Sequence, residues 1–201
     1  MTTTTTRFSR TAGRTLGQAA LAGAVGGLVA GIAGRIVMAV LAAVNEDASG
    51  IVTDDGFPIG RFTVGGTLSL VSFTVVIGAV GGLVVLALRG LRFGPAWFRV
   101  LSMPAGATVV AGSLLVHEGT DYTVLKPTWL AVSLILLIPL LYAFVVVALV
   151  DRWVEDGPAF WNRLPAALPW VARIGLAALT VFALGELVST IDEITNPFQF
   201  D

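Results

Sequence analysis

The sequence predicts an all-α integral membrane protein, a helical bundle with five transmembrane helices. Of the 201 residues, 56% are hydrophobic and only 12% are charged, and the mean hydropathy is +0.88. A soluble domain carries about 25% charged residues. The apolar residues also form five runs close to the ~20 residues that a helix needs to cross a bilayer. These runs cover residues 15–44, 64–88, 100–116, 127–150 and 169–191.

The third run is the shortest of the five, and it contains Pro104. A short run with an internal proline could be re-entrant, so four crossings are the alternative. Pro139 is expected to kink the fourth helix. The runs form one domain, with a disordered cytoplasmic tail at residues 1–14, the transmembrane bundle at 15–191 and an extracytoplasmic tail at 192–201.

Arginine positions predict the orientation of the chain in the plasma membrane. Basic residues precede the first run and lie in every second loop, at Arg7, Arg10, Arg14, Arg89, Arg92, Arg99, Arg152 and Arg163. Cytoplasmic loops are enriched in Lys and Arg. The amino terminus is therefore predicted to be cytoplasmic, and five crossings place the carboxyl terminus outside.

The first outer loop, "NEDASGIVTDDGFPIGRF", has apolar residues on both sides of a "DDG" turn signal. This pattern is typical of a β-hairpin. A small hairpin on the outer surface is therefore an alternative structure for this loop, although Pro58 weakens its second strand.

The run "GAVGGLV" occurs twice, at residues 23–29 and 78–84. Gly23, Gly27 and Gly31 recur every four residues in the first helix, and Gly78 and Gly82 do so in the second. Residues four apart share one helix face, and small residues let two backbones approach closely. The two faces are expected to meet in an antiparallel crossing, although the same faces could pack against a partner helix.

Two ionisable residues inside the runs are predicted to pair. Arg35 continues the glycine stripe of the first helix, and Glu186 lies at a similar depth in the last helix. A charge in the hydrocarbon region needs a partner or water. An Arg35–Glu186 ion pair would act as a structural staple or, alternatively, as a gate or proton site. Arg173 is expected to extend toward the headgroups, where it could meet Asp151.

Acidic residues of the two outer loops form a candidate metal site with the single histidine. His117, Glu118, Asp121, Asp54 and Asp55 could offer ligands to a divalent cation. The alternative is that these residues are polar because the loops are wet. No catalytic residue and no cofactor are predicted.

The segments "TDDGFPIGRFT" and "HEGTDYTVLKPTWLAV" resemble segments of an uncharacterised family of multi-pass membrane proteins of actinobacteria. Arginine outnumbers lysine strongly in the chain, which fits a GC-rich genome. The resemblance implies a membrane fold whose outer face is the shared part, which directs attention to His117, Asp121, Asp54 and Asp55. It implies no particular activity.

The sequence therefore favours a small membrane protein with a structural, accessory or interaction role. A small transporter or channel is the first alternative, and a membrane enzyme or metal-binding protein that uses the His117 cluster is the second. The expected partners are the lipid bilayer and other membrane protein subunits. Nucleic acid is not expected, because the basic residues adjoin the membrane. The oligomeric state stays open, since small-residue faces pack within one chain or between two.

Overall fold

The computed structural model shows a bundle of five long helices and describes residues 3–48, 50–52, 59–60, 63–117, 125–154, 161, 164–165 and 167–195. The helices are α1 (Thr3–Val44), α2 (Val64–Leu88), α3 (Ala96–Leu115), α5 (Thr128–Trp153) and α6 (Ala167–Thr195). Two short 3-10 helices, η1 (Glu46–Ala48) and η2 (Arg89–Leu91), follow α1 and α2. The predicted all-α class with five helices is confirmed.

All five helices are long and apolar enough to cross a membrane. The third run, for which a re-entrant segment was the alternative, is a continuous helix of 20 residues with Pro104 buried inside it. Its length favours five crossings over four. Pro139 likewise lies inside one continuous helix, α5.

α1 begins at Thr3, within the segment predicted to be a disordered tail. Extending a helix that has already formed requires no new nucleation, so a polar run without proline can continue it. At the other end of the chain, α6 continues to Thr195, a full turn beyond the predicted apolar run.

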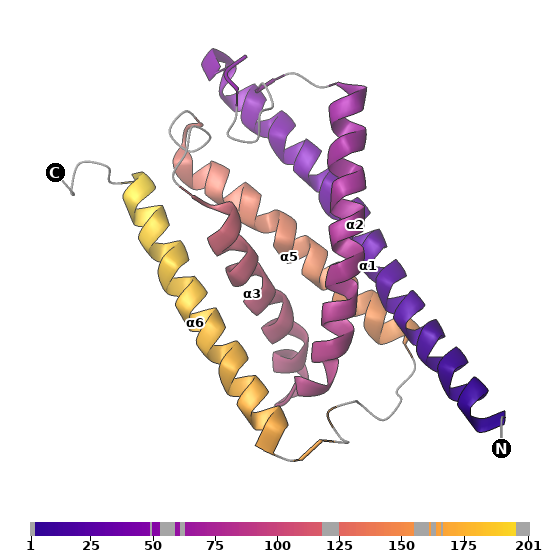
Figure 1. The fold of residues 1–201 in the computed structure, drawn as a ribbon. Helices are drawn as coiled ribbons and strands as arrows, with labels where there is room; N and C mark the ends of the chain where they lie inside the picture. Colours follow the sequence, from indigo (N-terminus) through magenta and orange to yellow (C-terminus); the bar gives the residue numbers. More distant parts are fainter. Residues whose placement is uncertain are drawn as a thin grey trace.

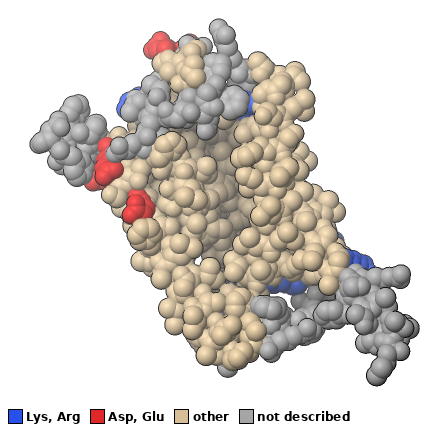
Figure 2. All heavy atoms as spheres, viewed as in Figure 1, with Lys and Arg blue, Asp and Glu red and all other residues tan. Residues whose placement is uncertain are grey.

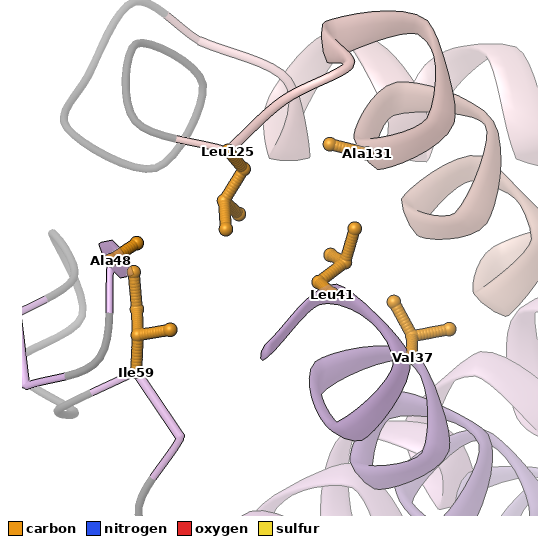
Figure 3. Packing of buried hydrophobic residues seen from close by; sticks show 6 residues of the cluster. All are labelled: Val37, Leu41, Ala48, Ile59, Leu125 and Ala131. Atoms are coloured by element: carbon orange, nitrogen blue, oxygen red, sulfur yellow. The ribbon is translucent and has the colours of Figure 1, made fainter. Parts of the chain in front are cut away.

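The loop between α1 and α2 contains no β-strand among its described residues, and residues 53–58, which would hold the predicted hairpin turn, lie outside them. Two backbone hydrogen bonds nevertheless connect its two sides. The amide of Gly50 donates a hydrogen bond to the carbonyl oxygen of Ile59, at 3.0 Å. The amide of Ile59 donates one to the carbonyl oxygen of Ile51, at 2.8 Å. The α1–α2 and α3–α5 loops also share a buried apolar cluster with α1 and α5 (Figure 3), formed by Val37, Leu41, Ala48, Ile59, Leu125 and Ala131.

Each helix packs on one or more of its neighbours in the bundle (Figure 1). α1 and α2 form the most extensive contact in the bundle, and α5 packs across α1. α3 lies between α5 and α6, and α6 packs mainly on α3 at the edge of the bundle. α1 and α6 are therefore on different sides of the bundle, with α3 and α5 between them.

Large apolar side chains cover the outside of every helix. Examples are Leu28 in α1, Phe73 in α2, Leu114 in α3, Leu137 in α5 and Val181 in α6. In Figure 2 a broad uncharged surface covers the middle of the molecule, and the visible charged side chains lie mainly toward its two ends. An apolar surface of this extent matches lipid rather than water as the surrounding medium.

Candidate functional site

The glycines of the repeated run bring α1 and α2 into backbone contact. A Cβ atom built on Gly23 would collide with the carbonyl oxygen of Gly78, and one built on Gly27 would collide with the carbonyl oxygen of Thr74. A Cβ on Gly82 would collide with the carbonyl oxygen of Ala19. The two faces meet within one chain, in the antiparallel crossing that the sequence indicated. Only glycine fits at these positions, because the obstacle is backbone that cannot rotate away.

The other glycine of each adjacent pair, Gly26 in α1 and Gly81 in α2, contacts side chains of α5. The hydroxyl of Tyr142 donates a hydrogen bond to the carbonyl oxygen of Gly78, at 2.8 Å. A Cβ on Gly81 would collide with that hydroxyl, and a Cβ on Gly26 would lie 3.2 Å from the ring of Tyr142. The closest atom to a Cβ on Gly26 belongs to Val146, also of α5, so the doublets at residues 26–27 and 81–82 serve two contacts, one with the facing helix and one with α5.

Sequence reasoning missed Tyr142. A signal was present, because each copy of the repeat carries two adjacent glycines and a single helix crossing needs only one of them. Adjacent residues lie about 100° apart around a helix, so a doublet leaves two separate faces bare. The second bare face needs a large side chain from a third helix to fill it.

The predicted ion pair between Arg35 and Glu186 is not formed. Arg35 lies in α1, which packs on α2 and α5, whereas Glu186 lies in α6, which packs mainly on α3. The Nη1 atom of Arg35 is 3.8 Å from the Sδ atom of Met38. Glu186 is exposed, and its carboxylate makes no ion pair with any described residue. Equal depth in the membrane does not make two helices neighbours, which is why the prediction was wrong.

At the opposite end of the bundle, Asp151 of α5 pairs with two arginines. Its Oδ1 atom is 3.2 Å from Nε of Arg89, and its Oδ2 atom accepts a 2.7 Å hydrogen bond from Nη1 of Arg92. Arg89 also donates to the carbonyl oxygen of Val154, at 3.1 Å. These bonds join the α2–α3 connection to the end of α5.

Arg173 does not meet Asp151, although the sequence suggested this contact. Its Nε atom donates to the carbonyl oxygen of Leu91 at 2.9 Å. Its guanidinium carbon lies 5.2 Å from the ring centroid of Phe93 and 4.9 Å from that of Trp170. Asp151 is held by Arg89 and Arg92 instead, because the turn after α2 brings those two arginines to the end of α5.

Only one member of the candidate metal site can be placed. His117 is exposed just beyond the end of α3, with its Nδ1 atom 3.1 Å from the carbonyl oxygen of Leu115. Glu118, Asp121, Asp54 and Asp55 lie outside the described residues. Within the part of the chain that the structure describes, no three His, Asp or Glu side chains gather closely enough to hold a metal ion.

The fold and these contacts define an all-α bundle of the multi-pass membrane class. Comparisons with protein-family models, with curated protein sequences and with solved structures found no match.

Proposed function

We propose that this chain is an accessory membrane protein that acts by binding another membrane protein along α6. The single observation that carries the proposal is Glu186, an exposed acidic residue in the interior of a membrane-length helix. It lies nine residues before the end of α6, which is about 13 Å along the axis at the rise of an α-helix.

A carboxylate that faces lipid at this depth is unfavourable. Ionised side chains within the hydrocarbon region cost about 2.5 kcal/mol or more near its centre, and such residues usually face a protein partner or water. The side chain of Glu186 makes no hydrogen bond with another described residue. A hydrogen-bond donor or a basic side chain on a partner helix would offset this cost, and it would give the partner a fixed position along α6.

The exposed side of α6 has the shape of a helix-binding surface. Gly175 and Gly185 face open space, since a Cβ atom on either would meet nothing within 4 Å. Val181, which is 70% exposed, and Phe182 lie between them along the helix. The glycines of the repeated run in α1 and α2 are already used by contacts inside the bundle, whereas Gly175 and Gly185 on α6 remain open for close approach by another helix.

The proposal includes the orientation of the chain in the plasma membrane. The arginine-rich end, which contains Arg14, Arg92 and Arg152, is assigned to the cytoplasm because cytoplasmic loops favour Arg and Lys. The amino terminus is then cytoplasmic and the carboxyl terminus extracytoplasmic. Glu46 and Asp47 of η1 lie on the outer side.

A photocrosslinking experiment in native membranes tests the accessory role. A benzophenone amino acid replaces Phe182 or Val188, which are exposed on α6. The matched control is Phe73, which is also exposed and lies nine residues from the outer end of α2. We expect both α6 positions to capture the same membrane protein, the control to capture none, and Glu186→Gln to reduce the capture.

Two outcomes would overturn the proposal. Crosslinks between two copies of this chain would mean that α6 mediates self-association and serves no separate partner. Equal capture from Phe73 and from the α6 positions would mean that the crosslinks report random collisions in the membrane. In either case Glu186 would require another explanation.

A further inference from the structure

We infer that the arginine-rich end of the α3–α6 helix pair binds the phosphate group of an anionic phospholipid, with Arg173 and Arg99 as its ligands. The inference is independent of the accessory role, since it concerns the opposite end of α6. It also holds whichever leaflet that end faces.

Contacts hold the guanidinium of Arg173 in a fixed position, and only its Nε atom makes a hydrogen bond with a described residue. The Nε atom is bound to the carbonyl oxygen of Leu91, and the planar group lies against the rings of Phe93 and Trp170. The two terminal nitrogens make no hydrogen bond or ion pair with a described residue. A guanidinium fixed by stacking presents its remaining N–H groups as a fork that matches two oxygens of one phosphate.

The register between α3 and α6 places Arg99 at the same end of this helix pair. A Cβ on Gly106 would lie 3.5 Å from the hydroxyl of Thr180, and one on Gly112 would lie 3.3 Å from the side chain of Leu187. The helices are therefore parallel neighbours. Arg99 lies seven residues before Gly106, and Arg173 lies seven residues before Thr180. Seven residues are nearly two turns, so both arginines lie on the facing sides of their helices at the same depth.

Like Arg173, Arg99 has no anionic partner among the described residues. It is exposed, and the carboxylate of Asp151 at this end of α5 is already paired with Arg89 and Arg92. α3 also begins after Pro95, whose side chain provides no cap for the first amides of the helix. An uncapped helix start adds further positive potential at the same end of the α3–α6 pair.

Aromatic side chains around this end indicate that the phosphate belongs to a lipid. Trp97 is 65% exposed, Trp170 is 58% exposed, and Phe93 is also exposed. The ring of Phe93 lies 6.5 Å from that of Trp170, centroid to centroid. Tryptophan side chains settle at the depth of the headgroups, with the ring against glycerol and acyl chains. A phosphate bound between the arginines would place its acyl chains along these exposed rings.

Native mass spectrometry of the full chain in detergent tests the inference. The probes are dioleoyl phosphatidylglycerol, dioleoyl phosphatidylcholine and inorganic phosphate. Phosphatidylglycerol should bind saturably and about tenfold more tightly than phosphatidylcholine, whose choline cation opposes the arginines. Arg173→Gln and Arg99→Gln should each weaken phosphatidylglycerol binding about tenfold, and Arg173→Lys should weaken it less than Arg173→Gln.

Arg152→Gln is the matched control, because it removes one exposed arginine at the same end of the bundle but on α5, outside the α3–α6 pair. It should change binding by less than about twofold. Arg99→Gln keeps the test valid if Arg173→Gln fails to fold, since the exposed side chain of Arg99 makes no hydrogen bond or ion pair with a described residue.

Three results would overturn the inference. Equal binding of the two lipids would remove the role of the anionic charge. An equal loss of binding in Arg152→Gln and Arg99→Gln would mean that the whole basic end attracts anions without a defined site. Displacement of phosphatidylglycerol by millimolar inorganic phosphate would assign the site to a free phosphate ion in place of a lipid.

Discussion

The hydroxyl of Tyr142 in α5 donates a hydrogen bond to the backbone carbonyl oxygen of Gly78 in α2, at 2.8 Å. Gly78 is also a point of closest approach between α2 and α1, where a Cβ would collide with the carbonyl oxygen of Gly23. Gly78 of α2 therefore contacts both α1 and α5. We expect Tyr142→Phe, which keeps the ring, to lower the free energy of unfolding by about 1 kcal/mol.

Thermal unfolding in detergent would measure this loss, with Trp129→Phe as a control because Trp129 is exposed on the same helix. Gly81 provides a second test. Its replacement by Ala should cost less in the Tyr142→Phe background than in the wild type, because the atom that blocks the new methyl group is the tyrosine hydroxyl. Equal costs in both backgrounds would contradict the placement of Tyr142.

Gly27→Ala should destabilise the bundle by about 2 kcal/mol, because the added methyl group would force the α1 and α2 backbones apart. Gly34→Ala is the matched control on the same helix. A Cβ there would lie 3.8 Å from the side chains of Ile138 and Leu70, which is an ordinary contact. Chemical or thermal unfolding of both variants would compare them. Similar stability for the two would mean that α1 and α2 are not in backbone contact.

Glu186→Gln should leave the stability of the isolated chain within about 0.5 kcal/mol of the wild type. The reason is that its carboxylate pairs with no described residue and that α6 does not pack on the helix that carries Arg35. Thermal unfolding of the purified chain would measure the difference. A large loss of stability would restore the structural staple between Arg35 and Glu186.

Asp151→Asn should lower the free energy of unfolding by about 1 kcal/mol, the upper range for partly exposed ion pairs. The carboxylate is shared by Arg89 and Arg92 and is 38% exposed, so added salt should reduce the difference between variant and wild type. Asp47→Asn, at an exposed carboxylate of η1, is the control and should have little effect. The free energy of unfolding of both variants, measured at low and high ionic strength, would distinguish the effect of Asp151→Asn from that of Asp47→Asn. A loss in Asp151→Asn that does not depend on salt would contradict the electrostatic explanation.

Single cysteines test the proposed orientation, since the chain contains no cysteine of its own. Thr195→Cys, at the exposed end of α6, should react with a membrane-impermeant maleimide on whole cells. Ala96→Cys, at the start of α3, should react only after the membrane is permeabilised. Gel-shift labelling would detect both. The reverse pattern would place the amino terminus outside, and labelling of both on whole cells would contradict an odd number of crossings.

Much of the fold could be predicted because the signals are local. The length and hydropathy of each run identified all five helices, and α2 has the predicted bounds, residues 64–88. The four-residue spacing of Gly23 and Gly27 indicated a bare helix face. Hydropathy and helical period act on one helix at a time, so the sequence alone determined which segments form helices long and apolar enough to span a membrane, and which face of α1 approaches another helix.

Tertiary structure decided which helices are neighbours. Arg35 and Glu186 have similar predicted depths but lie in helices that α3 and α5 separate, and nothing in either helix alone reveals this. The approach of Tyr142 to Gly78, and the register that sets Arg99 opposite Arg173, likewise depend on how whole helices pack. The physical reason is that the bilayer sets the depth of each residue along its helix, whereas the order of helices around the bundle depends on side-chain fit between segments far apart in the chain.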